Sequence, residues 1–128
     1  MRPLETAEAA IVFPLLPGKR EMLTAFIAEL SGARREAHQQ NHAGVQWESW
    51  FFQQTPQGDL VIVYLQAQDP MEVFVDLAVS QAPFAVWFRQ QTLDMTGIDL
   101  ALLPPFSLPQ RLLHWQRSEE RPNAEENI

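Results

Sequence analysis

The chain has 128 residues, 46% of them hydrophobic and 20% charged, a composition that suits one folded domain and excludes a disordered chain. It contains no cysteine, so a disulfide framework, a zinc-thiolate site and a thiol nucleophile are excluded, and a cytoplasmic location is expected. The formal net charge of −7 disfavours nucleic acids and anionic membranes as partners, because both are themselves negatively charged.

The first half of the chain predicts a strand followed by a long helix. Residues 1–8 are expected to be ragged, and residues 9–116 to form a single domain. The apolar run at 9–16 is rich in strand-forming residues. From 19 to 40 apolar residues recur at helical spacing, with the Ser31-Gly32 pair as a weak point in the middle.

Two further strands are predicted at 45–54 and 60–66, because both segments are rich in aromatic and β-branched residues. Pro56 and Gly58 lie between them and favour a hairpin. The second of these runs is apolar on both of its sides. It is therefore expected to be a central strand, covered on both faces.

The remainder of the chain predicts a second helical region and a last strand. Asp69 followed by Pro70 is typical of a helix start, and Pro83 interrupts and restarts the helix. The alternating segment 111–116 predicts a strand, and residues 117–128 a solvated acidic tail.

The predicted order is βαββαβ, an α+β fold of the ferredoxin-like type with two helices on one face of a four-stranded antiparallel sheet. The other face of that sheet would carry Trp, Phe, Val or Leu side chains from several strands. Such a patch is too large and apolar for a monomer in water. We therefore expect a symmetric homodimer that pairs two such faces.

Glu48 is the first candidate for chemistry, because it lies in the sequence between Trp47 and Trp50. Desolvation by the two indoles would raise the pKa of its carboxyl group toward that of a useful general base. However, strand alternation puts Trp47 and Trp50 on opposite faces, and Glu48 on the face of Trp50. A purely structural role for Glu48, as the partner of an arginine or a backbone group, is the favoured alternative.

His38 and His42 are four residues apart near a helix end, which could place two imidazoles on one side for a metal. The residues between them are poor third ligands, and Glu36 points elsewhere on the helix. A histidine near a helix C-terminus is also favourable without any metal. We therefore expect no metal, and retain His38 together with Glu48 as the candidates for proton transfer.

Aromatic residues and one arginine are the candidates for ligand binding. Tyr64 is the only tyrosine of the chain, and its buried hydroxyl would need a partner or could orient a ligand. Trp87 belongs to an aromatic stripe at helical spacing, for which packing on the sheet is the favoured explanation. Arg89 could bind an anionic ligand or be a solvated side chain. With Trp47 and Trp50, these residues would line a pocket between sheet and helices.

Several short motifs together resemble a family of small bacterial proteins without an agreed activity, similar to members of the dimeric α/β-barrel superfamily. The resemblance covers roughly residues 9–100. Its motifs are Phe13-Pro14, Pro17-Gly18-Lys19, Glu48-Ser49-Trp50-Phe51, Gly58-Asp59-Leu60, Pro83-Phe84, Trp87-Phe88 and Gly97-Ile98-Asp99. The resemblance implies a ferredoxin-like fold and a dimer whose two sheets form a barrel. Related members include monooxygenases of antibiotic biosynthesis that need no cofactor, haem-degrading enzymes and small isomerases.

Two hypotheses of function follow. The first is a dimeric small-molecule-binding protein, which in one version is an enzyme similar to the cofactor-independent monooxygenases or isomerases. The second is a non-catalytic domain whose sheet face serves dimerisation only. No glycine-rich phosphate loop, nucleophile elbow or dinucleotide fingerprint occurs, so no cofactor is expected.

Overall fold

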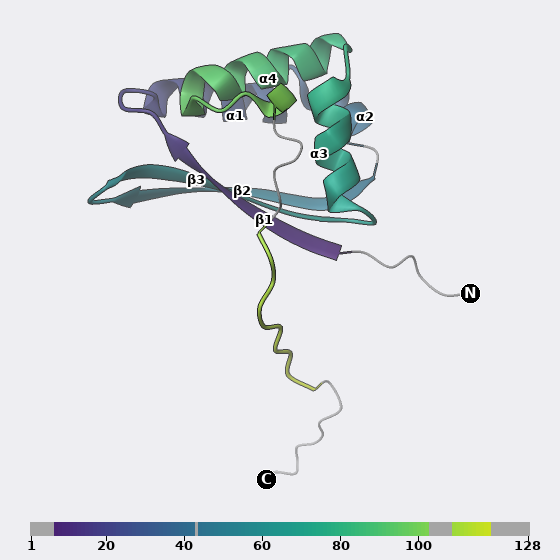
Figure 1. The fold of residues 1–128 in the computed structure, drawn as a ribbon. Coiled ribbons are helices and arrows are strands. Elements are labelled where there is room, and N and C mark those ends of the chain that lie inside the picture. The colour runs from purple at the N-terminus through teal and green to yellow at the C-terminus, as the bar shows by residue number, and fades with distance from the viewer. Residues whose placement is uncertain (1–6, 43, 103–108, 119–128) are drawn as a thin grey trace.

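The computed structural model describes residues 7–42, 44–102 and 109–118. A single layer of helices covers one face of a small antiparallel sheet (Figure 1). The elements in chain order are β1 (Ala7–Leu15), α1 (Arg20–Ser31), α2 (Arg35–Asn41), β2 (Val45–Thr55), β3 (Gly58–Ala67), α3 (Pro70–Val79), α4 (Pro83–Thr96) and the 3-10 turn η1 (Leu100–Leu102).

The sheet has the order β1-β3-β2, and both pairs of strands are antiparallel. The apolar strand β3 is central, as its sequence predicted. Val63 of β3 pairs with Ile11 on one side and Trp50 on the other, and these three side chains point toward the helices. β2 and β3 form the predicted hairpin, with Gly58 at a positive φ of 130°.

The prediction of a ferredoxin-like βαββαβ fold with a four-stranded sheet is wrong. The described residues form a three-stranded sheet in the order β-α-α-β-β-α-α. The segment 111–116, predicted as the fourth strand, extends away from the sheet on the side opposite the helices (Figure 1). Alternating side chains favour an extended chain, but a strand also needs a neighbour for its backbone groups, and no described strand pairs with this segment.

The predicted long helix over 19–40 is two helices, α1 and α2, because the chain breaks where Gly32 follows Ser31. A Cβ atom at position 32 would lie only 2.9 Å from the carbonyl oxygen of Ala28. Arg34 donates its backbone N–H to the carbonyl of Glu29 and closes the break. α1 and α2 are therefore separate helices, joined by a short turn over residues 32–34.

The second helical region also consists of two helices, α3 and α4. Asp69 caps α3 by accepting the backbone N–H of Glu72 at 3.2 Å, and Pro83 starts α4. Gly97 ends α4 in the left-handed conformation. No single helix in the described part of the chain is long and apolar enough to cross a membrane; α3 and α4 reach that limit only together, across a bend of 95°.

The core lies between the sheet and the helices. It consists of apolar side chains from β1, β3, α1, α3, α4 and η1, with Phe26 and Met95 the largest fully buried ones. A cavity within it, beside Trp50 and Phe88, measures about 30 Å³, the space of about one water molecule. The pocket predicted between sheet and helices is therefore filled by side chains at this place.

The opposite side of the sheet is covered by no helix, and we call it the open face (Figure 1). Its larger apolar and aromatic residues include Val12, Trp47, Phe51, Ile62 and Tyr64. Trp47 and Phe51 are 60% and 55% exposed. The sequence-based expectation of an apolar uncovered face is thus met by side chains from all three strands.

Candidate functional site

Glu48 reaches the helical side of the sheet because of a bulge in β2. The register of β2 against β3 shifts by one residue between Val45 and Trp47, which makes Gln46 the extra residue. Side chains alternate along a strand, so one extra residue turns every later side chain to the other face. Glu48 therefore lies opposite the buried Leu65 and faces the helices.

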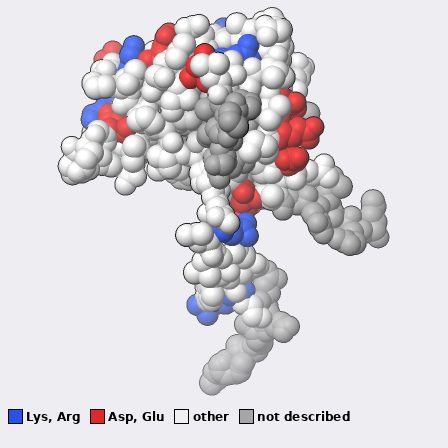
Figure 2. Space-filling model, in the orientation of Figure 1, with Lys and Arg blue, Asp and Glu red and all other residues white. Residues whose placement is uncertain are grey.

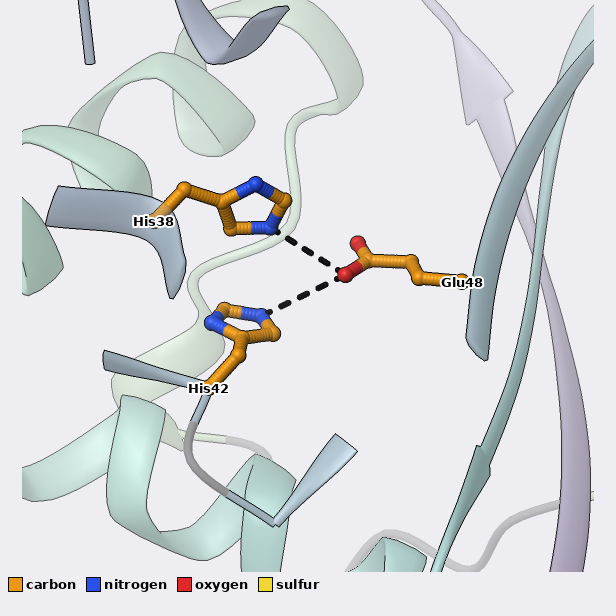
Figure 3. Close-up of side chains that lie close together, drawn as sticks. All are labelled: His38, His42 and Glu48. Atoms are coloured by element: carbon orange, nitrogen blue, oxygen red, sulfur yellow. Dashed lines mark hydrogen bonds and ion pairs between the residues drawn. The ribbon is translucent and has the colours of Figure 1, made fainter. Parts of the chain in front are cut away.

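Two histidines approach Glu48 from the end of α2. His38 lies in the last turns of this helix and His42 is its C-terminal cap, so both rings project from the same side. The Nε2 atom of His38 is 3.1 Å from Oε1 of Glu48, and Nε2 of His42 is 3.9 Å from the same oxygen. Figure 3 shows both rings directed at this single carboxylate oxygen.

Aromatic side chains of α4 fix the two imidazoles. Phe84 stacks on the ring of His38 at a centroid distance of 5.7 Å, and meets His42 edge-on at 6.3 Å. Phe88 lies 6.2 Å from the ring of His42. Both phenylalanines are buried, so they restrict the orientation of the imidazoles before any ligand arrives.

The carboxylate of Glu48 is held from two sides. Trp50 donates its indole N–H to Oε2 at 2.6 Å, while His38 occupies Oε1. Burial acts to raise the pKa of Glu48, whose side chain is only 13% exposed. The hydrogen bonds of His38 and Trp50 and the charge of His42 outweigh burial, and the pKa lies below its ordinary value of 4.5. Glu48 is therefore an anion at neutral pH.

His42 is the most enclosed member of the cluster, with a side chain that is 8% exposed. Burial lowers its pKa from the ordinary 6.5, and the nearby carboxylate of Glu48 only partly opposes this. Its Nδ1 atom is buried with no hydrogen-bond partner. The main-chain carbonyls of Asn41 and His38 act to raise the pKa, although neither is in hydrogen-bonding geometry with Nδ1. A neutral imidazole is thus favoured here.

An open pocket of about 660 Å³ adjoins the cluster, between the end of α1, α2 and the start of β2. Polar and charged side chains line most of it, with apolar residues at its borders. The lining consists of Leu30, Ser31, Arg35, His38, Gln39, His42, Val45, Gln46, Trp47 and Glu48. The site thus combines a preformed ionisable cluster with room for a small molecule.

The structure brings together the two residues predicted for proton transfer, Glu48 and His38. Trp47 lies at the border of the pocket, where the bulge begins. Trp50 lies beneath Glu48 and packs on Phe26 at 5.5 Å. Its contribution to the site is therefore to orient the carboxylate.

The other three predicted ligand-binding residues lie elsewhere. Trp87 is packed between Phe26 and the guanidinium of Arg34, which lies 4.1 Å above its ring. Tyr64 points to the open face and donates its hydroxyl hydrogen to Glu8 at 2.5 Å. Arg89 donates to the backbone carbonyls of Leu77 and Ser80, each at 2.7 Å, and so closes the end of α3. None of these three lines the pocket beside Glu48.

Sequence reasoning missed Arg35, Gln39 and Gln46 as pocket residues. Arg35 and Gln39 are four apart on α2, a spacing that places them near one another. Gln46 carries no signal at all, since its position depends on the bulge. The two missed glutamines and the arginine give the pocket its polar lining.

Comparison of the chain with protein-family models, with curated proteins and with solved structures finds no match in any of the three. The resemblance to the dimeric α/β-barrel superfamily therefore stays a prediction. The geometry of the site itself is therefore the basis for its proposed function.

The shifted pKa values of His42 and Glu48 predict how the stability of the protein depends on pH. As pH falls below 6.5, unfolded His42 gains a proton that the folded chain resists, so the free energy of unfolding decreases. The stability that Glu48 contributes is present above pH 4.5 and is lost as pH falls through its lower folded pKa. Urea unfolding between about pH 7.5 and about pH 5 should show a falling midpoint.

The His42→Gln variant should show a flatter profile over the upper part of this range, because glutamine does not titrate. His114 is exposed and far from the cluster in sequence, so His114→Gln is the matched control and should keep the parent profile. A parent midpoint that is constant or rises on acidification would contradict the assignment of a neutral His42.

Proposed function

We propose that this protein binds a small anionic molecule in the pocket beside Glu48, and that it works as a cytoplasmic homodimer. The observation that carries the proposal is the position of the His38, His42 and Glu48 cluster at the border of an open pocket of about 660 Å³. Buried ionisable groups at a pocket are common where a protein binds or converts a ligand. The absence of cysteine supports a reducing compartment.

The position of Arg35 favours the proposal that the ligand is an anion. It lines the pocket from the first turn of α2, with its side chain exposed. Guanidinium groups bind carboxylate and phosphate through paired hydrogen bonds. Gln39 and Gln46 add neutral donors and acceptors on the same lining. In a chain with a net charge of −7, an anion needs such a local cation to bind.

A thermal-shift screen tests this binding proposal. Anionic metabolites should raise the unfolding temperature of the parent, since a ligand at 100 times its Kd stabilises the native state by about 2.7 kcal/mol. The Arg35→Ala variant should lose most of the shift. Arg117→Ala removes an arginine that is distant from the pocket and should keep it. Equal shifts in the Arg35→Ala variant and the parent, or shifts from neutral compounds only, would contradict the proposal.

Proton transfer is the second candidate function, favoured by the 3.1 Å contact between His38 and Glu48. A carboxylate hydrogen-bonded to an imidazole is a common acid-base pair. In this version the pair moves a proton on the bound molecule without any cofactor. The Glu48→Gln variant should then keep ligand binding and lose turnover by roughly 100-fold or more. A variant that both binds and turns over like the parent would refute the catalytic role.

The homodimer proposal is supported by two exposed apolar surfaces of the same chain. One is the open face. The other is the C-terminal arm, residues 109–118, in which Leu112 and Leu113 are 89% and 81% exposed and Trp115 is 70% exposed. Arg111 pairs with Glu8 at the end of the open face, which fixes the base of the arm. The arm then extends away from its own sheet, and its arginines form the blue groups below the body in Figure 2.

The areas of the open face and the C-terminal arm indicate that both are needed for one dimer interface. Strands of 9 to 11 residues in a three-stranded sheet give a face of about 33 by 14 Å, or roughly 450 Å². A stable interface buries about 800 Å² per partner, so the open face alone is too small. An extended arm of about 33 Å adds a strip as long as the strands. Residues 112–118 hold no Gly, Pro, Asn or Asp for a tight reversal, so we place the arm on a second copy.

Disulfide trapping tests this arrangement, because the chain has no native cysteine. Two differently tagged chains are co-expressed, one with Leu113→Cys in the arm and one with Phe51→Cys on the open face. Mild oxidation should link the two chains. Val79 on α3 is 63% exposed and lies on the helical layer, so Val79→Cys in place of Phe51→Cys is the matched control and should link poorly.

Light scattering on the parent gives an independent readout, with a particle of two 14.7 kDa chains expected. A monomeric parent at all concentrations would refute the dimer. Equal linking with the Val79→Cys control would refute the contact between arm and open face.

A further inference from the structure

We propose that His38, His42 and Glu48 bind one divalent first-row transition-metal ion at the floor of the pocket. The proposal deepens the binding function above, because the ion would hold the anionic ligand in the same pocket. It does not require that ligand, since the three donors belong to the chain itself. The two inferences can therefore fail separately.

The distances between the donor atoms fit a metal centre. The two Nε2 atoms and Oε1 of Glu48 lie within 4.8 Å of one another. Metal bonds of about 2.0–2.2 Å place neighbouring ligand atoms about 2.8–3.6 Å apart, from octahedral to tetrahedral geometry. The 3.1 Å between His38 and Glu48 is inside this range, and the 3.9 Å between His42 and Glu48 exceeds it by a few tenths of an ångström. The two imidazole nitrogens are limited only by the 4.8 Å of the whole set, so a movement of up to about 1 Å would bring all three donors into range.

Apart from the hydrogen bond between His38 and Glu48, which a metal ion would replace, the hydrogen bonds of the cluster leave these donor atoms available. Trp50 occupies Oε2 of Glu48 and orients the carboxylate, so Oε1 points to the imidazoles. Such outer hydrogen bonds are typical of metal sites, where they fix the ligand that carries them. Phe84 lies against both imidazole rings and performs the same task by packing.

His42 gives an independent indication that a partner is needed. At 3.9 Å its Nε2 is too far from Glu48 for a hydrogen bond, and its Nδ1 is buried without a partner. Nε2 of His42 is therefore free to bind a metal ion, and Nδ1 then carries the proton of the neutral ring.

The donor set also indicates the kind of metal and its use. Two imidazoles and one carboxylate suit zinc, iron, cobalt or nickel better than calcium or magnesium, which prefer oxygen donors only. Three protein ligands leave at least one position free, and this cluster adjoins the open pocket. A carboxylate or phosphate could then bridge the ion and Arg35, which lines the same pocket.

The test uses the full chain, freed of metal by chelation, and Co²⁺ and Zn²⁺ alone as probes. Calorimetry should give one ion per chain, and Co²⁺ should develop visible absorption bands of a nitrogen- and oxygen-ligated centre. The chain has three histidines, so imidazole NMR signals are few. Zn²⁺ should shift the signals of His38 and His42 and leave those of His114 unchanged.

Variants then assign the ligands. His38→Gln and Glu48→Gln should each weaken Zn²⁺ binding by more than the roughly 10- to 100-fold typical of losing an outer hydrogen-bond partner. Trp50→Phe removes only the indole donor and should fall within that 10- to 100-fold range. His114→Gln is the matched control and should bind like the parent. Circular dichroism checks that each variant is folded.

The NMR experiment needs no variant, so the proposal stays testable even where a buried substitution prevents folding. Zn²⁺ that shifts His114 as strongly as the other two histidines would overturn the proposal. Calorimetry without saturable binding would overturn it as well, as would unchanged affinity in a folded Glu48→Gln variant. Saturable Zn²⁺ binding with no anion that shifts the unfolding temperature would support the metal site and refute the anion-binding function.

Discussion

The candidate site depends on one irregularity, the bulge at Gln46. Without this extra residue, the register that starts at Val45 would place Glu48 opposite Tyr64 and turn it toward the open face. The carboxylate would then be separated from both histidines by the thickness of the sheet. The bulge instead brings Glu48 under the end of α2, and the hydrogen bonds of His38 and Trp50 offset the cost of burying its charge. The bulge at Gln46 therefore determines both the position of Glu48 and the burial of its charge.

The histidines depend on a second interruption, between α1 and α2. His38 belongs to α2, which the break at Gly32 separates from α1, so its position is not fixed by α1. Phe84 and Phe88 of α4 then hold the imidazoles against β2. Since Pro83 starts α4 just before these phenylalanines, its restart also sets their position. Interruptions of regular structure therefore assemble the cluster from three separate segments.

The sequence allowed most elements to be predicted, because each has a local signal. Asp69 with Pro70 marked the start of α3, and Pro83 marked the start of α4. The strand over 111–116 was predicted wrongly, since alternation of side chains describes an extended chain whether or not a neighbouring strand pairs with it. The break at Gly32 was anticipated only as a weak point. Whether a Ser-Gly pair ends a helix depends on the packing around it, which the local sequence does not reveal.

The cluster shows the same division between local and non-local information. The spacing of His38 and His42 was visible, but the expectation of no metal considered third ligands on the same helix only. The third donor lies on a strand, and its approach depends on a register shift that single-sequence patterns do not reveal. Glu48 was selected for the indoles beside it, and only one of them, Trp50, contacts it. The structure thus supports only part of the reasoning that selected Glu48.

Trp47 links the pocket to the proposed dimer. The bulge that turns Glu48 inward leaves Trp47 on the open face, while Trp47 also borders the pocket. A second copy placed over the open face would cover this indole and become part of the pocket wall, so the two surfaces would not be independent. A ligand that contacts Trp47 would then bind the dimer and the monomer with different affinities, and by linkage it would shift the dimerisation equilibrium. In the proposed dimer, the position of one side chain would therefore couple assembly to binding without any change in the cluster itself.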